Sequence, residues 1–343
     1  MAQNLILHYF VINIYTNHKL NYIALRVCKE MYMFRMRKTP MYRIPQDNLP
    51  IMNKIIEICN NYNIKPEFIQ TRGHATGIGD ILFRFLSIKN KLFNDVFYIN
   101  LNYFTKPYYG MEPINQFEFR IKLIMDICRY NDIPLHQIKF TFSNILDIEH
   151  RLRYNEITDF NLKLCTTENN TENNTTDKEY IIFHTKCRHT KEENYVTLKQ
   201  KIKLFCKNNK CHYKIIIMGE RVMPYTAEVE AHDITTIYNE LIELKDVNDV
   251  EDITIENIYS NLDYENYKKD IELIKNAKYN ICFGIGGQFC SCVCFGKSTI
   301  VYCKIDNQLN TQAFNKTNFY FNNIDSCLKK LQDLCFECES IPN

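Results

Sequence analysis

The chain has 343 residues, a length that suggests two domains or one large domain with an ample core. Hydrophobic residues make up 45% and charged residues 24%, which excludes wholesale disorder. A formal net charge of +2 argues against nucleic acid or an anionic membrane as the main partner. The 9 glycines and 9 prolines beside 23 tyrosines are typical of an AT-rich genome.

The 15 cysteines are odd in number and spread from Cys28 to Cys338, so they do not form the framework of a small disulfide-rich protein. We therefore expect free thiols and a cytoplasmic location. The apolar stretch 4–15 contains His8 and Asn13 and lacks a basic region and a cleavage site. No run approaches the ~20 apolar residues of a membrane-spanning helix.

In the first half of the chain, strand and helix patterns alternate. Residues 1–60 are expected to form an N-terminal extension packed on a first Rossmann-like domain, 61–164. Within that domain the pattern predicts, in order, a short run 67–71, a glycine loop 72–80, a helix 81–92, a strand 95–104, a helix 118–130 and a strand 138–142. This alternation favours a parallel sheet covered by helices.

Residues 165–178, CTTENNTENNTTDK, are polar and almost free of apolar side chains. Such a segment buries too little surface to offset its ordering entropy, so we expect a flexible linker or loop.

The second half, 179–343, repeats the rhythm and is predicted to be a second Rossmann-like domain. The pattern predicts a strand 180–185, a helix around 198–205, a strand 214–220, helices around 237–241 and 267–274, a strand 279–283, a glycine loop 284–288, a short helix 289–295 and a strand 298–303. The predicted fold class is therefore α/β, with two Rossmann-like domains.

The first glycine loop contains two candidate catalytic residues, His74 and Asp80. Asp80 follows Gly77 and Gly79 at a strand-to-helix turn, where a carboxylate either caps the helix or acts as a general base. His74 either assists deprotonation of the acceptor, binds phosphate, or is a hydrogen-bonded loop histidine.

The second glycine loop is a candidate diphosphate site, because three of the chain's nine glycines fall within four residues between a strand and a helix. Backbone N–H groups at a helix start suit an anion, and glycine lets the anion approach. Alternatively, the glycines only permit close packing. The candidate ligand-binding residues are Gly284, Gly286, Gly287, Gln288 and Ser291.

Two more strand ends fall on the same predicted edge of the sheet. Lys186 and Arg188 are candidates for neutralising phosphate, although a charged loop is also simply solvated. Gly219 and Glu220 follow the next strand, where the carboxylate either accepts hydrogen bonds from a ribose or base or faces solvent.

No metal site is expected from the sequence. Cys290, Cys292 and Cys294 diverge on a helix, and Cys335 and Cys338 form a single C-x-x-C without a second pair. The cysteines are interpreted as small buried hydrophobic residues.

These elements together resemble GT-B glycosyltransferases, which have two Rossmann domains, and most closely the heptosyltransferase-like branch that uses nucleotide diphosphate sugars. The counterparts are IIIMGE, Asp252-Ile253-Thr254, KNAKYNICF and GIGGQFCSCVCFGKSTIVY, together with Gly79-Asp80. The likeness covers residues ~65–305 and departs at Gly-Gly-Gln-Phe-Cys-Ser, which replaces an Asp-Ser-Gly-x-x-His motif.

The resemblance implies a metal-independent transferase that moves a sugar from a nucleotide diphosphate donor to a glycan, lipid or protein acceptor across a central cleft, with Asp80 as base. No Asp-x-Asp triplet occurs, and no cofactor is expected beyond the donor as co-substrate. Two alternatives stay open: a sugar-nucleotide epimerase of the same fold, or a non-catalytic binding protein derived from such an enzyme.

Overall fold

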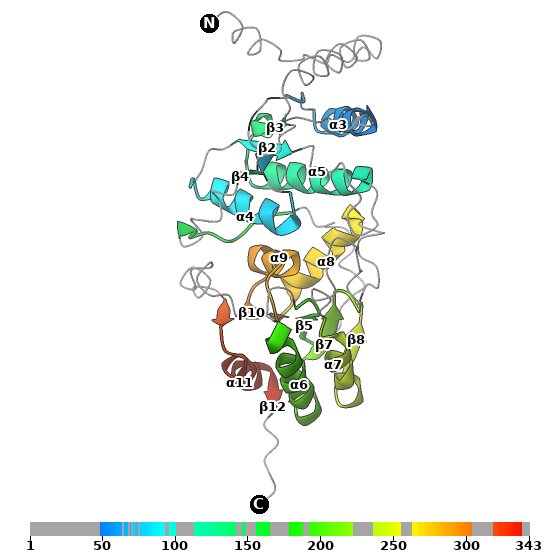
Figure 1. Ribbon diagram of the computed structural model, residues 1–343, viewed down its shortest axis with the longest axis vertical. Helices are drawn as coiled ribbons and strands as arrows, with labels where there is room; N and C mark the ends of the chain where they lie inside the picture. The colour runs from blue at the N-terminus through cyan, green and yellow to red at the C-terminus, as the bar shows by residue number, and fades with distance from the viewer. Residues whose placement is uncertain are drawn as a thin grey trace, which may run out of the picture. The chain divides into compact units, whose positions relative to one another are not determined.

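In the computed structural model the chain forms two compact units (Figure 1). The structure describes residues 49–63, 65–67, 69, 71, 73–74, 76–92, 96–100, 113–141, 146–147, 156–164, 178–187, 192–221, 236–254, 263–303 and 318–337. Unit 1 takes its described residues from 49–76, 93–107 and 112–152, and unit 2 takes its own from 77–92 and 153–343. Most of the predicted extension and linker, and Arg188, lie outside the described residues.

Unit 1 is a parallel sheet with helices. Its elements are α3 (Leu49–Asn61), β1 (Gly73–His74), β2 (Phe97–Asn100), α5 (Pro113–Tyr130), a 3-10 turn (Leu135–Gln137), β3 (Ile138–Thr141) and β4 (Leu146–Asp147). The strands lie in the order β3-β2-β1-β4, and every neighbouring pair is parallel.

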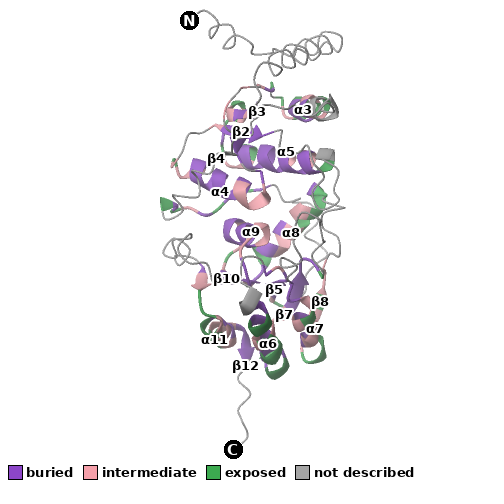
Figure 2. Cartoon of the chain, in the orientation of Figure 1, coloured by how far each residue is buried: buried purple, intermediate pink, exposed green. Residues whose placement is uncertain are grey.

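The core of unit 1 follows from the helical repeat of α5. Phe117, Ile121, Ile124 and Cys128 recur at spacings of three and four residues, and all four are fully buried. Figure 2 shows α5 as buried along most of its length. Helix α3 packs against α5, and the Tyr62 hydroxyl just beyond α3 lies 2.7 Å from an Asp126 oxygen.

Unit 2 contains a larger, six-stranded parallel sheet in the order β11-β10-β9-β5-β7-β8. Its strands are β5 (Tyr180–His184), β7 (Lys214–Met218), β8 (Val250–Asp252), β9 (Tyr279–Cys282), β10 (Thr299–Tyr302) and β11 (Phe319–Phe321). A separate two-stranded antiparallel pair joins β6 (Lys210–Cys211) to β12 (Phe336–Glu337).

Helices cover both faces of the larger sheet, as in doubly wound folds (Figure 1). They are α6 (Glu192–Asn208), α7 (Tyr238–Ile242), α8 (Tyr264–Asn276), α9 (Gly287–Phe295) and α11 (Ile324–Cys335), with a 3-10 turn (Glu243–Asp246) after α7. Helix α4 (Ile78–Lys89) packs against α9. Because both faces are covered, the interior strand β7 carries the consecutive buried residues Ile215, Ile216 and Ile217.

The structure confirms the predicted α/β class with parallel strands, and it corrects three local features. The first strand is β1, inside the predicted glycine loop, so His74 is a strand residue. Strand β8 was not predicted, because its Val-Glu-Asp sequence is that of a short, charged edge strand. The elements β11 and α11 were also not predicted.

Helix α4 belongs to unit 2 although it precedes the predicted linker, and so do residues 156–164. The Leu162 N–H donates to the Cys294 carbonyl at 3.0 Å, which ties this segment to α9. The predicted domain limits at 61–164 and 179–343 stay a prediction. No helix among the described residues is long and apolar enough to cross a membrane.

Candidate functional site

The topology of unit 2 singles out one edge of its sheet. Strands β5 and β9 are neighbours, but the chain continues from β5 to β7 on one side and from β9 to β10 on the other. Loops that leave two such strands turn in opposite directions and open a crevice at the carboxyl ends. The predicted ligand-binding residues follow β5, β7 and β9, which are consecutive strands at this edge.

The segments after β5 and β7 are joined by hydrogen bonds. The Thr185 N–H donates to the Met218 carbonyl at 3.0 Å, and the Glu220 N–H donates to Thr185 Oγ1 at 2.8 Å. Lys186 Nζ lies 4.0 Å from Glu220 Oε1, and the two side chains are 13% and 1% exposed. The mostly buried lysine therefore lies beside a buried carboxylate at this edge.

Gly219 allows a close approach between β7 and α9. Its φ of +126° is a conformation that L side chains rarely adopt, and a Cβ there would lie 2.7 Å from Gln288 Nε2 and closer still to Thr185 Oγ1. The structure thus brings together Thr185, Gly219 and Gln288, which are far apart in the sequence. Gln288 Oε1 is buried and has no hydrogen-bond partner among the described residues.

The second glycine loop leads directly into α9. Gly284 is buried, and Gly286 is the N-cap residue, with no side-chain hydrogen bond to the cap. The first backbone hydrogen bond of the helix is donated by the Cys290 N–H to the Gly286 carbonyl at 2.9 Å. The backbone N–H groups before Cys290 therefore belong to the first turn, where a helix offers them no carbonyl partner. A Cβ at Gly286 would meet nothing within 4 Å, whereas one at Gly287 would lie 3.4 Å from Ile78.

The start of α4 contacts the start of α9 within unit 2. A Cβ at Gly79 would lie 2.9 Å from the sulfur of Cys290. Asp80 is in the first turn of α4 and folds back toward its N-cap residue Gly77, where a Cβ would lie 2.9 Å from Asp80 Oδ2. A carboxylate in this position is favoured by the helix dipole, and it is also near the proposed ligand-binding edge.

Two predicted site residues lie in packed surroundings. Ser291 is 2% exposed, donates to the Gly287 carbonyl at 2.9 Å and pairs with the Tyr267 hydroxyl at 2.9 Å, so its hydroxyl is held inside unit 2. His74 belongs to unit 1 and is 1% exposed. Its Nδ1 accepts from the Tyr98 N–H at 3.0 Å, and its ring packs on Phe97, which is the environment of a core histidine.

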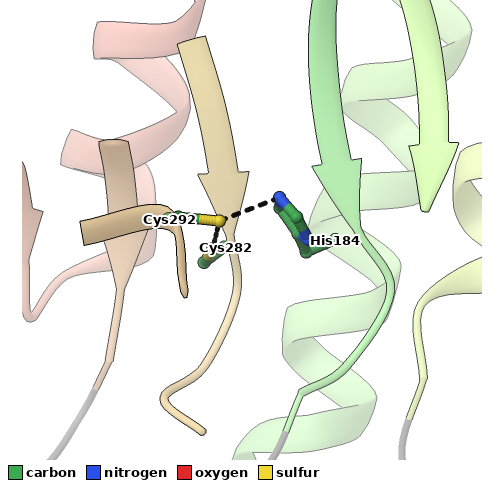
Figure 3. A group of neighbouring side chains, drawn as sticks. All are labelled: His184, Cys282 and Cys292. Atoms are coloured by element: carbon green, nitrogen blue, oxygen red, sulfur yellow. Dashed lines mark hydrogen bonds between the residues drawn. The ribbon is translucent and has the colours of Figure 1, made fainter. Parts of the chain in front are cut away.

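A cluster that was not predicted lies at the ends of β5 and β9. His184, Cys282 and Cys292 are all buried, and their ligand atoms lie within 4.8 Å of one another. Figure 3 shows the three side chains pointing toward a common centre, from β5, β9 and α9. Cys292 Sγ lies 3.0 Å from His184 Nε2 and 3.9 Å from Cys282 Sγ.

Burial controls the protonation of this cluster. Desolvation lowers the pKa of His184 to about 4, against a hydrogen bond with Asn280 that raises it, so the imidazole is neutral near pH 7. Burial also raises the pKa of the Cys292 thiol well above its usual range. In the absence of a cation, the His184 imidazole and the Cys292 thiol are therefore both uncharged. The sequence signal was weak because His184 lies 108 residues before Cys292.

Asp270 on α8 is a further residue that sequence reasoning missed. Burial raises the pKa of its carboxyl to about 6, opposed by the charge of Lys269. A polar residue on an amphipathic helix has no sequence pattern that reveals such desolvation.

Comparisons with protein-family models, with curated proteins and with solved structures found no match. The functional interpretation therefore depends on the geometry of the chain itself.

Proposed function

We propose that the chain is a glycosyltransferase whose unit 2 binds a nucleotide diphosphate sugar. One observation carries the proposal: the strand order places the segments after β5, β7 and β9 at adjacent carboxyl ends, beside the crevice between β5 and β9. The sequence pattern predicts donor-binding residues in all three segments: Lys186 and the second glycine loop for phosphate, and Glu220 for a ribose or base.

The diphosphate is assigned to the open first turn of α9. Its N–H groups and the positive end of the helix favour an anion, and Gly286 leaves space for one to approach the backbone. Gln288 supplies an amide beside Gly219. Glu220 is assigned to accept hydrogen bonds from a ribose hydroxyl or from the base.

Asp80 is assigned as the base that takes the proton from the acceptor hydroxyl. Its place in the first turn of α4, next to the start of α9, supports this role, because the attacked sugar carbon is attached to the diphosphate.

A glycine substitution tests the diphosphate site without disturbing the protein interior. Gly286→Val adds a side chain where no described atom lies within 4 Å, and the extended φ of 161° accepts any residue. We expect the variant to bind UDP, GDP, ADP or CDP about 10–100-fold more weakly in calorimetric titration, since each hydrogen bond to a charged group contributes ~1.5–3 kcal/mol.

The bare nucleosides are the control, because they lack the phosphates and should bind the variant as they bind the wild type. If no nucleoside diphosphate binds the wild type, the nucleotide site is refuted. If the variant and the wild type bind equally, the first turn of α9 is not the site.

Turnover is tested separately with Asp80→Asn, which preserves shape while removing the proton acceptor. We expect the rate of sugar transfer to fall by ~10²–10⁴-fold with unchanged donor affinity. Normal turnover would leave Asp80 as a residue that stabilises the start of α4.

A second candidate is a nucleotide-binding protein without transferase activity. The proximity of Lys186 to Glu220 favours it, because the carboxylate already neutralises a cation that would otherwise stabilise the leaving diphosphate. This candidate would be supported if the chain binds the nucleotide but neither transfers the sugar to any acceptor nor hydrolyses the donor.

A further inference from the structure

We propose that His184, Cys282 and Cys292 bind a soft divalent cation of the zinc class, which joins β5, β9 and α9. The cluster consists of one imidazole nitrogen and two sulfurs, and all three side chains are buried. This assignment is independent of the proposed transferase activity.

The donor spacing is close to that of a tetrahedral site. Zn–S bonds of ~2.3 Å and Zn–N bonds of ~2.0–2.1 Å place two sulfurs ~3.8 Å apart, and a sulfur and a nitrogen ~3.6 Å apart. The two sulfurs lie 3.9 Å apart, and His184 Nε2 lies 3.0 Å from Cys292 Sγ. An opening of about half an ångström between the ring and one sulfur would accommodate the ion.

Asn280 offers an oxygen at the same place. It is fully buried, its Oδ1 lies 3.4 Å from His184 Nε2, and its Nδ2 is held by donation to the Ile274 carbonyl at 3.0 Å. The held Nδ2 fixes the amide so that its oxygen faces the cluster. A nitrogen and an oxygen bound to one zinc ion lie ~3.4 Å apart, so Asn280 fits a fourth position.

The donor chemistry and the charge both favour a soft divalent ion. Thiolate and imidazole ligands select zinc-like metals, whereas magnesium and calcium prefer oxygen. Two thiolates and a neutral imidazole cancel the charge of a divalent ion, so the occupied cluster is neutral in a buried site. A monovalent ion would leave a net negative charge there.

Binding releases the two thiol protons to the buffer as the metal–sulfur bonds form, and no oxidant is needed. A competing explanation for the close sulfurs is oxidation to a disulfide. Such a bond needs an external two-electron oxidant, and the histidine beside Cys292 would have no part in it.

The first experiment measures the metal content of the full-length wild-type chain, purified under reducing conditions without chelators. Mass spectrometry of the elements should find about one zinc per chain. After removal of the metal, added cobalt(II) should give the visible absorption of a tetrahedral site and a sulfur-to-cobalt charge-transfer band.

Variants locate the ion within a cysteine-rich chain. Cys282→Ser and Cys292→Ser should each lower the affinity for cobalt by at least about 100-fold, beyond the loss typical of indirect contacts. The matched control is Cys206→Ser, which changes a fully buried cysteine on α6 outside the cluster and should bind as the wild type does.

Protein stability provides a second readout. Added zinc should raise the melting temperature of the metal-free wild type and of Cys206→Ser, and leave both cluster variants unchanged. Should a cluster variant fail to fold, the content and cobalt spectrum of the wild type still decide the matter.

Three results would overturn the proposal. They are a wild type that holds no metal and gives no tetrahedral cobalt spectrum, cluster variants that retain the metal, and a Cys282–Cys292 disulfide in the reduced preparation. None of these results bears on nucleotide binding, so failure here is distinct from failure of the proposed function.

Discussion

Replacing Gly219 with alanine should destabilise unit 2 at the junction of three segments. The residue has a φ of +126°, and a Cβ would contact Thr185 Oγ1 and lie 2.7 Å from Gln288 Nε2. Thr185 is fully buried and its Oγ1 accepts the Glu220 N–H at 2.8 Å, so the new methyl group also competes with that bond.

The magnitude follows from these contacts. A positive φ costs an L residue ~1–2 kcal/mol, and disturbing one internal hydrogen bond costs about 1 kcal/mol more. We therefore expect Gly219→Ala to lower the free energy of unfolding by about 2–3 kcal/mol.

The matched control is Gly286→Ala, which has an extended φ of 161° and open space around the new Cβ. The same chemical change there should be neutral or stabilise by up to ~1 kcal/mol, because it restricts the unfolded chain.

Urea unfolding followed by circular dichroism measures both variants, and the comparison depends on the difference between them. The two units can unfold separately, so the transition that shifts must be assigned to unit 2, for example by hydrogen exchange in β7. Equal stability of the two variants would refute the assigned backbone conformation of Gly219 and its contact with Gln288.

Two further predictions concern side chains of unit 2. Burial raises the pKa of Asp270 from 3.8 to about 6, so its stabilising contribution is fully present below about pH 4 and is lost as the pH rises through about 6. Asp270→Asn should therefore raise the melting temperature at about pH 8, by an amount equivalent to about 1–3 kcal/mol. At about pH 4 the same substitution should have no such effect. Ser291→Ala removes the hydroxyl paired with Tyr267, so we expect a loss of about 1–3 kcal/mol in thermal unfolding with unchanged nucleotide affinity; an affinity loss as large as that of Gly286→Val would instead place Ser291 at the ligand.

The sequence predicted the parallel α/β class because buried strands and amphipathic helices have distinct periodicities. Runs such as Ile215–Ile217 can be identified without a structure, and so can the apolar face of α5. The short edge strand β8 was missed because edge strands carry charged residues. The strand order also could not be derived, since pairing is decided by contacts between distant segments.

The residues of the proposed ligand-binding edge were partly predictable for a similar reason. Glycine loops and charged residues at strand ends are visible in the sequence, and parallel strands bring their carboxyl ends to one side. Side-chain partners are not visible. The pairing of Ser291 with Tyr267, the position of Lys186 beside Glu220 and the burial of His74 all depend on packing.

Helix α9 links the two proposed sites, because its first turn is assigned to the diphosphate and its middle carries Cys292. A metal bound to His184 and Cys282 would hold the helix against β5 and β9, and so fix the N–H groups at its start. A preorganised set of N–H groups binds an anion with less loss of conformational entropy than a mobile one. In this view α9 and its N-cap residue Gly286 serve both proposed sites, because Gly286 leaves space for the ligand and Cys292 would hold the helix to the sheet.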